Sequence, residues 1–205
     1  MVERTEAITY VVDDNDAFRE SLELLFETVN IKTKAYKSAK VFLSDFDASQ
    51  SGCLVLDIRM PEMSGLELQK RLQEMQCHLP IIIITGHADV AVAIEAMKKG
   101  AFDFIEKPFR DQVLLDSVNK ALELNASTWR VLTEATSVRE KLNFLTPRER
   151  QVLKGIIAGK TNKIIAKELE LSPKTTDFHR SNIMEKMGVN SAVQLTKMVI
   201  KSEAT

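Results

Sequence analysis

The chain has 205 residues, of which 44% are hydrophobic and 28% charged, as is ordinary for a globular protein. No apolar run approaches the roughly 18 residues that cross a bilayer, and residues 1–6 lack the features of a secretion signal, so we expect a cytoplasmic protein with no membrane partner. Residues 1–125 hold 14 Lys and Arg against 21 Asp and Glu, whereas residues 126–205 hold 14 against 8. This asymmetry indicates that only the second half meets nucleic acid.

The first half alternates short apolar strands with amphipathic helices. Strands are predicted over residues 8–12, 31–36, 53–57, 80–85 and 102–105. Helices are predicted over residues 16–29 and 89–99, the second of which ends at Gly100. Three further helices are predicted to begin at the capping residues Ser38, Ser64 and Asp111. Five strand–helix units predict an α/β domain over residues 1–122, a doubly wound parallel sheet of the flavodoxin type with helices on both faces.

The second half is predicted to be entirely helical. Residues 123–143 contain neither Gly nor Pro and predict a helical linker that continues the fifth helix, with residues 125–128 as its weak point and Trp129 packed against a domain or a partner. Capping boxes at 146–149 and 191–194, and Ser172 followed by proline, mark helix starts. Together with a helix over about 162–169, they predict a four-helix domain over residues 144–205.

Polar side chains follow four strands of the predicted sheet. Asp13 and Asp14 come after the first strand, and Asp57, Thr85 and Lys107 end or follow the third, fourth and fifth. The carboxyl ends of parallel strands share one edge, where ligands bind. Carboxylates brought together there call for a hard divalent cation, Mg²⁺ or Mn²⁺. Asp57 can then attack phosphorus as a nucleophile, while Lys107 and the Thr85 hydroxyl hold the other phosphoryl oxygens.

The stretches 11–16, 54–65, 84–87 and 104–108 closely resemble the receiver domains of two-component response regulators. The resemblance implies that Asp57 accepts a phosphoryl group from a sensor histidine kinase. It also implies that Asp14, Asp57 and the backbone carbonyl of Arg59 ligate Mg²⁺, and that Asp13 acts mainly through water.

The same resemblance has implications for five positions. Thr85 and Phe104 are the implied conformational switch pair, and the peptide bond before Pro108 is expected to be cis. The side chains of Arg59 and His87, two residues beyond Asp57 and Thr85, are expected to control how long the phosphoryl group survives.

The third helix of the C-terminal domain, residues 173–187, is the candidate DNA-reading helix, because a short turn at 170–172 joins it to the helix before it. Helical spacing places Thr176, His179, Ile183 and Met187 inward. The predicted DNA-contacting residues are Lys163, Lys174, Thr175, Asp177, Phe178, Arg180 and Ser181. Asp177 can accept from a cytosine amino group and Phe178 can contact a thymine methyl, while the cations suit the phosphate backbone.

Residues 145–153, 162–166 and 174–180 resemble the LuxR-type (GerE-like) helix-turn-helix. The pairing of this domain with a receiver is similar to the NarL/FixJ family, and nearest its FixJ branch. There are two departures from the family pattern: Thr176 replaces the usual valine, and Asp177-Phe178 replaces a charged residue followed by valine.

We therefore expect a phosphorylation-dependent transcriptional regulator that is not an enzyme, beyond promoting its own phosphorylation and dephosphorylation. Phosphorylation is expected to drive formation of a homodimer on a palindromic DNA site, with RNA polymerase as a further partner. Two alternatives stay open. A phosphatase that uses an aspartyl-phosphate needs a second acid two residues after the nucleophile, where Arg59 stands. A receiver fused to a protein-interaction bundle would not bind DNA.

Overall fold

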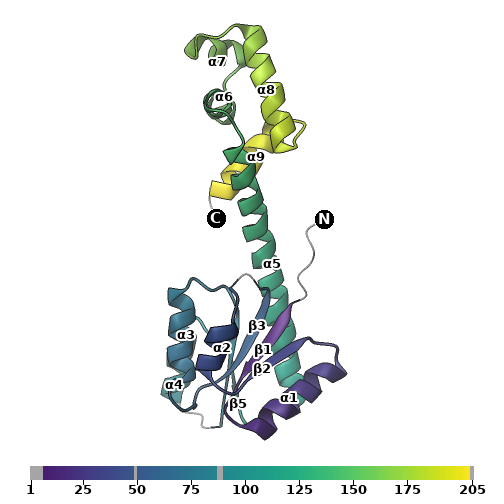
Figure 1. Ribbon diagram of the computed structural model, residues 1–205, viewed down its shortest axis with the longest axis vertical. Coiled ribbons are helices and arrows are strands. Elements are labelled where there is room, and N and C mark those ends of the chain that lie inside the picture. The colour runs from purple at the N-terminus through teal and green to yellow at the C-terminus, as the bar shows by residue number, and fades with distance from the viewer. Residues whose placement is uncertain (1–6, 49, 87–89, 204–205) are drawn as a thin grey trace. The chain divides into compact units, whose positions relative to one another are not determined.

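The structure, a computed structural model, describes residues 7–48, 50–86 and 90–203. It divides into two compact units, Met1–Trp129 and Arg130–Thr205 (Figure 1). None of the helices in the described part of the chain has the length and apolar character to span a membrane.

The first unit is a five-stranded parallel sheet in the order β2-β1-β3-β4-β5, which confirms the predicted doubly wound fold. Its elements are β1 (Ile8–Val12), α1 (Asp16–Thr28), β2 (Thr33–Tyr36), α2 (Ala39–Asp45), β3 (Gly52–Asp57), α3 (Gly65–Glu74), β4 (Ile81–Thr85), α4 (Val90–Lys98), β5 (Asp103–Glu106) and α5 (Asp111–Asn143). Residue 89, the first residue of the predicted fourth helix, lies outside the described residues.

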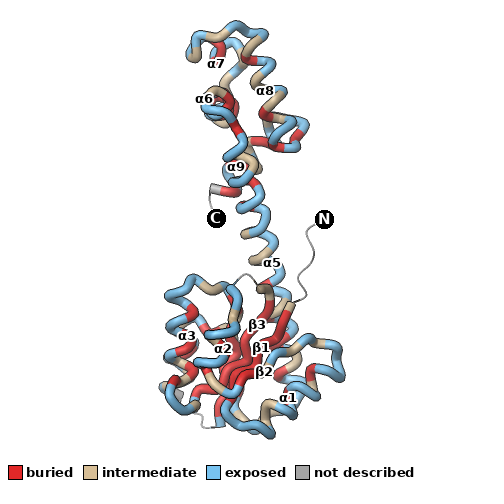
Figure 2. The backbone as a smooth tube through the Cα atoms, viewed as in Figure 1, coloured by how far each residue is buried: buried red, intermediate tan, exposed pale blue. Residues whose placement is uncertain are grey.

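Two apolar layers cover the sheet, one on each face. Alternate strand residues such as Tyr10 and Leu56 pack with Phe42 of α2 and Leu68 of α3. The intervening strand residues pack with helices α1 and α5, through Leu22, Phe26, Leu114 and Val118. The three inner strands β1, β3 and β4 are therefore buried along their whole length, while the edge strands and the helices keep exposed residues (Figure 2).

Most of the predicted helix ends are confirmed. The hydroxyls of Ser38 and Ser64 cap α2 and α3, and Gly100 adopts φ +77° after α4, a conformation that favours glycine. The prediction for Asp111 was wrong in detail, because this residue is the first of α5 instead of the cap before it. An acid in the first turn is still favourable to the helix dipole.

Helix α5 runs without a break through residues 125–128, so the predicted weak point was wrong. Asn125 is 1% exposed, and its Oδ1 accepts hydrogen bonds from the Gly52 amide and the Ser51 hydroxyl, both at 2.8 Å. Its Nδ2 donates to the His78 carbonyl at 3.0 Å. Because the amide is satisfied by the segments that precede β3 and β4, it does not compete with the helix backbone.

The second unit contains α6 (Pro147–Ile157), α7 (Asn162–Glu168), α8 (Pro173–Met187) and α9 (Ala192–Glu203), packed around one apolar core. Capping by Thr146 and Ser172 is confirmed. The predicted capping box at Ser191 is only half formed: the Ser191 hydroxyl accepts from the Gln194 amide, but the Gln194 side chain accepts from Asn190 instead.

Residues 130–143 of α5 belong to this second unit. Val138 is buried in its core, Lys141 Nζ donates to the Met187 carbonyl at the end of α8, and Arg139 donates to the Ser202 carbonyl near the end of α9. Cations at helix C-termini offset the unpaired carbonyls there. The stretch predicted as a linker is thus divided between the two units.

Replacement of Asn125 by alanine tests its role in the α/β unit. Asn125→Ala leaves the buried Gly52 amide and the His78 carbonyl without their partner, so we expect the free energy of unfolding to fall by about 2 kcal/mol. Urea denaturation of the full-length protein, followed by circular dichroism, measures the loss. Ser127→Ala, which removes an exposed hydroxyl on the same helix, is the control and should change stability by less than about 0.5 kcal/mol. Equal midpoints for the two variants would contradict the assignment.

Candidate functional site

Three of the predicted pocket residues are buried at the carboxyl edge of the sheet. Asp13 follows β1, Asp57 ends β3 and Thr85 ends β4; their exposed fractions are 1%, 6% and 2%. Strands β1 and β3 are direct neighbours with Val12 beside Leu56, so the next residue on each strand carries its carboxylate into the same space.

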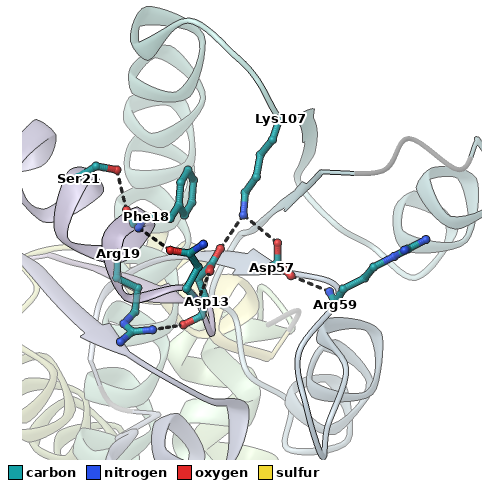
Figure 3. Close-up of polar contacts among 8 residues, drawn as sticks. Asp13, Phe18, Arg19, Ser21, Asp57, Arg59 and Lys107 are labelled. Atoms are coloured by element: carbon teal, nitrogen blue, oxygen red, sulfur yellow. Dashed lines mark hydrogen bonds and ion pairs between the residues drawn. The ribbon is translucent and has the colours of Figure 1, made fainter.

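Lys107, from the segment after β5, joins the two acids. Its Nζ lies 2.7 Å from Asp13 Oδ2 and 2.9 Å from Asp57 Oδ1 (Figure 3). It also lies 3.8 Å from the centroid of the Phe18 ring, a cation–π contact. The peptide bond from Lys107 to Pro108 is cis, as expected.

Burial raises the pKa of Asp57 above its ordinary value, although the hydrogen bond and charge of Lys107 act in the opposite direction. The neighbouring Asp13 charge raises it further, and the Arg59 amide, which donates to Asp57 Oδ2 at 2.7 Å, lowers it. The net effect on the Asp57 pKa is set mainly by burial, which disfavours the charged carboxylate.

The sequence did not single out the residues that hold Asp13 in place. The Asn15 amide donates to Asp13 Oδ1 at 2.8 Å, and Arg19 donates to the Asp13 carbonyl at 2.6 Å (Figure 3). Arg19 also pairs with Asp16. Asn15 was recognisable as a cap residue before α1, but a guanidinium six residues away that reaches a main-chain carbonyl leaves no local signal.

The remaining predicted residues of the pocket differ in exposure. Asp14 and Arg59 are exposed, and Phe104 is half-buried against the core. His87 lies outside the described residues, so the structure does not place its side chain.

Among the described residues, no three acidic, histidine or cysteine side chains surround one point as a metal site. The donors nevertheless suit a hard cation, because Asp13 and Asp57 already direct carboxylate oxygens at one ammonium group. Carboxylate and carbonyl oxygens are the ligands that Mg²⁺ prefers.

A second candidate site is the exposed face of α8. Lys174, Asp177, Phe178 and Ser181 are exposed there, while Thr175 and Arg180 are half-buried; Lys163 is exposed on α7. Phe178 is 62% exposed, so its ring is accessible on the same side of α8 as these polar residues.

The inward face of α8 largely matches the prediction. Thr176, Ile183 and Met187 are fully buried, and His179 is half-buried. The Thr176 hydroxyl, at the position where valine is usual, donates to the Ser172 carbonyl at 3.1 Å, so its polar group is satisfied in the core.

One contact on α8 was not predicted. The Asn162 side-chain amide, at the start of α7, donates to the Asp177 carboxylate. The two residues are fifteen positions apart on different helices, so helical periodicity could not pair them.

Helix α8 is also bound to α6 by an ion pair between an exposed lysine and a buried glutamate. Lys186 Nζ lies 2.7 Å from Glu149 Oε2, and the Glu149 side chain is only 3% exposed. Burial opposes the charge of Glu149, but hydrogen bonds from Lys186 and Thr146 outweigh it and hold the pKa of this carboxyl below its ordinary value. Glu149 thus serves both the capping box and the packing of α8.

Comparisons with known proteins match each part of the chain to a family. Residues 9–119 match the response regulator receiver domain, and residues 143–199 match the bacterial regulatory proteins of the luxR family. The transcriptional regulatory protein FixJ of Rhizobium meliloti is 41% identical over 196 residues, 96% of each chain. The response regulator TodT of Pseudomonas putida is 41% identical over 94% of this chain and 85% of its own. The solved structure of the response regulator StyR has a TM-score of 0.89 at 40% identity and covers 96% of this chain and 99% of that one.

A buried acidic pocket on a five-stranded parallel sheet, combined with a helix-turn-helix unit, defines a phosphorylation-controlled DNA-binding regulator. The chain belongs to the response regulators that join a receiver domain to a luxR-family DNA-binding domain, the group that includes FixJ. The luxR-family match favours a DNA-binding unit over a protein-interaction bundle, and membership of a family of transcriptional regulators argues against a phosphatase.

Replacement of Glu149 by glutamine tests the tie between α6 and α8. Glu149→Gln should lower stability at pH 7 by roughly 1–2 kcal/mol, because the buried charge-assisted bond to Lys186 is lost. Since the folded-state pKa lies below the ordinary 4.5, the contribution is present above pH 4.5 and disappears as the pH falls through the lower, folded-state pKa. Thermal unfolding between pH 7 and pH 3 should therefore show the two proteins converging in acid.

Glu168→Gln is the matched control for this test, because Glu168 pairs with Lys160 but both side chains are exposed. It should cost less than about 0.5 kcal/mol at any pH. A Glu149→Gln loss that persists unchanged at pH 3 would show that the carboxylate charge is not the cause.

Proposed function

We propose that Asp57 is the phosphoacceptor and that its phosphorylation controls DNA binding by the C-terminal unit. The observation that carries this proposal is the geometry of the pocket: a buried Asp57 carboxylate shares the Lys107 ammonium with Asp13 at the carboxyl edge of the sheet. The family is one in which a sensor kinase supplies the phosphoryl group.

In the proposed reaction, a carboxylate oxygen of Asp57 forms a bond to phosphorus as the bond from phosphorus to the histidine nitrogen of the kinase breaks. The electron pair of the broken bond leaves with that nitrogen. Lys107 and the Thr85 hydroxyl stabilise the negative charge on the transferred oxygens. Hydrolysis of the acyl phosphate returns Asp57 to its carboxylate, so the chain promotes only its own phosphorylation and dephosphorylation.

We propose Mg²⁺ or Mn²⁺ as the cofactor of this step. Asp14, Asp57 and the Arg59 carbonyl would hold the ion, and Asp13 would act through water. The ion supplies positive charge against the phosphoryl oxygens. The raised pKa of Asp57, caused mainly by burial, supports a need for a cation beyond Lys107. The side chains of Arg59 and His87 would set the phosphoryl lifetime by controlling access of water.

The proposed response runs through Thr85 and Phe104 to the face of α4, β5 and α5. The phosphorylated receiver, residues 1–122, would dimerise, and the pair of DNA-binding domains, residues 144–205, would engage a palindromic site in the cytoplasm next to RNA polymerase. Residues 123–143 would link the two domains.

The proposed DNA surface is the exposed side of α8 with the start of α7. Lys174 and Arg180 would contact phosphates together with Lys163, while Asp177 and Phe178 would reach base edges. Thr175 and Ser181 complete the surface. The exposure of Phe178 and the excess of basic residues in this half of the chain support the assignment.

Intact-mass measurement tests the phosphorylation step. Incubation with Mg²⁺ and a small phosphodonor should add about 80 Da, the mass of one phosphoryl group as on other phospho-residues. EDTA should prevent the addition, because the cation is removed. Asp57→Ala should abolish it, and Asp116→Ala, which removes an exposed acid on α5, should not. An adduct of about 80 Da that still forms on the Asp57→Ala variant would contradict the assignment of Asp57 as the phosphoacceptor.

Salt dependence tests the proposed phosphate contacts. The double variant Lys174→Ala/Arg180→Ala should bind mixed genomic DNA fragments more weakly. It should also flatten the slope of log K against log salt by about two, since each phosphate contact contributes roughly 0.9. Lys197→Ala removes an exposed cation on α9, away from α8, and should leave the slope unchanged. Equal slopes for all three proteins would argue that α8 does not lie on the DNA backbone.

A further inference from the structure

Asp177 is a negatively charged residue on the exposed side of α8, where a DNA-binding surface is expected to carry positive charge. The cations Lys174 and Arg180 stand on the same helix, and DNA carries a dense negative charge. A freely rotating carboxylate on such a surface is repelled by phosphates. A carboxylate held against a base edge can accept a hydrogen bond from an exocyclic amino group instead.

The Asn162 amide is the group that restrains this carboxylate. Its Nδ2 donates to Asp177 Oδ1, so one carboxylate oxygen is occupied and the other stays available as an acceptor. Asn162 is half-buried, whereas Asp177 is exposed. The donor is therefore the more restrained member of the pair.

Both helix ends that bear the pair are fixed locally. Thr161 caps α7 directly before Asn162. On α8, the Ser172 hydroxyl accepts from the Thr175 amide at 3.0 Å, and the side chain of Thr176, next to Asp177, is fully buried. The backbone on each side of the contact is thus well defined, which limits the positions that the carboxylate can take.

We propose that Asn162 is a specificity-determining residue that positions Asp177 to read an amino group in the major groove. An oriented carboxylate accepts from the amino group of cytosine or adenine, and it opposes guanine and thymine, whose edges present acceptors at that height. This inference rests on the proposed function, because it requires α8 to lie on DNA. It adds a residue of α7 to base reading, where the sequence assigned only α8.

Selection from a randomised DNA library by the full-length, phosphodonor-treated protein tests the inference. Asp177→Ala should lower the preference at one base position about tenfold or more. Asn162→Ala should lower the preference at that same position several-fold, and the double variant should behave like Asp177→Ala alone, because the two residues act as one unit. The salt dependence of binding should not change in Asn162→Ala, since this substitution removes no charge and Asn162 does not contact phosphate in the proposed complex.

Two further variants sharpen the test. Asn162→Asp keeps the size of the side chain and suits the helix N-terminus, but it removes the donor and repels Asp177, so it should lose at least as much preference as Asn162→Ala. Lys163→Ala, next in the chain, should instead weaken binding to all sequences alike and flatten the salt dependence.

The outcomes separate the inference from the proposed function. If Asn162→Ala weakens binding to all sequences equally and flattens the salt dependence of binding, Asn162 is a phosphate contact and the inference is overturned. It is also overturned if Asn162→Ala changes the base preference at a different position from Asp177→Ala. The same holds if the double variant loses the product of the two single losses in preference. If the wild-type protein selects no sequence at all, the proposed function fails and the inference fails with it.

Discussion

The Lys107 ammonium between two buried carboxylates is the interaction on which the receiver unit depends. Asp13 and Asp57 are almost inaccessible to water, and adjacent buried carboxylates repel strongly unless a cation lies between them. The three residues come from the ends of β1, β3 and β5, so they meet only when the sheet has formed in its full order. The same geometry buries Asp57, and burial raises the pKa of its carboxyl above the ordinary value. A pocket of this kind is poised to respond to anything that changes its charge, as a phosphoryl group does.

Helix α5 carries polar contacts of both units along one continuous helix. Asn125 satisfies main-chain groups at the start of β3 and before β4, whereas Arg139 and Lys141 satisfy carbonyls at the ends of α9 and α8. A linker that contributed only length would not need these contacts. The ends of the helix are thus parts of the two units that they join, and the stability of each unit includes a segment of α5.

The DNA-binding unit uses its acids in two different ways. Glu149 is buried and paired, so its charge contributes to the packing of α8 on α6. Asp177 is exposed and held by Asn162, so its charge is available at the surface. Positive residues on a DNA-binding surface raise affinity for every sequence, whereas a positioned acceptor discriminates among bases. In the proposed complex, Asp177 would therefore lower the affinity for DNA in general and raise the selectivity among bases.

The sequence by itself determined the order and kind of the elements, most helix caps, and the set of residues at the carboxyl edge of the sheet. Hydrophobic periodicity and capping residues act between near neighbours, so both are readable locally. The tertiary structure alone decided where polar side chains find their partners. Residues 125–128 were predicted to be a weak point of the helix, yet Asn125 accepts a hydrogen bond from the amide of Gly52, 73 positions away. Likewise, Asn162 and Asp177 meet only because α7 and α8 pack together. Hydrogen bonds between distant segments depend on the folded chain, and no local pattern encodes them.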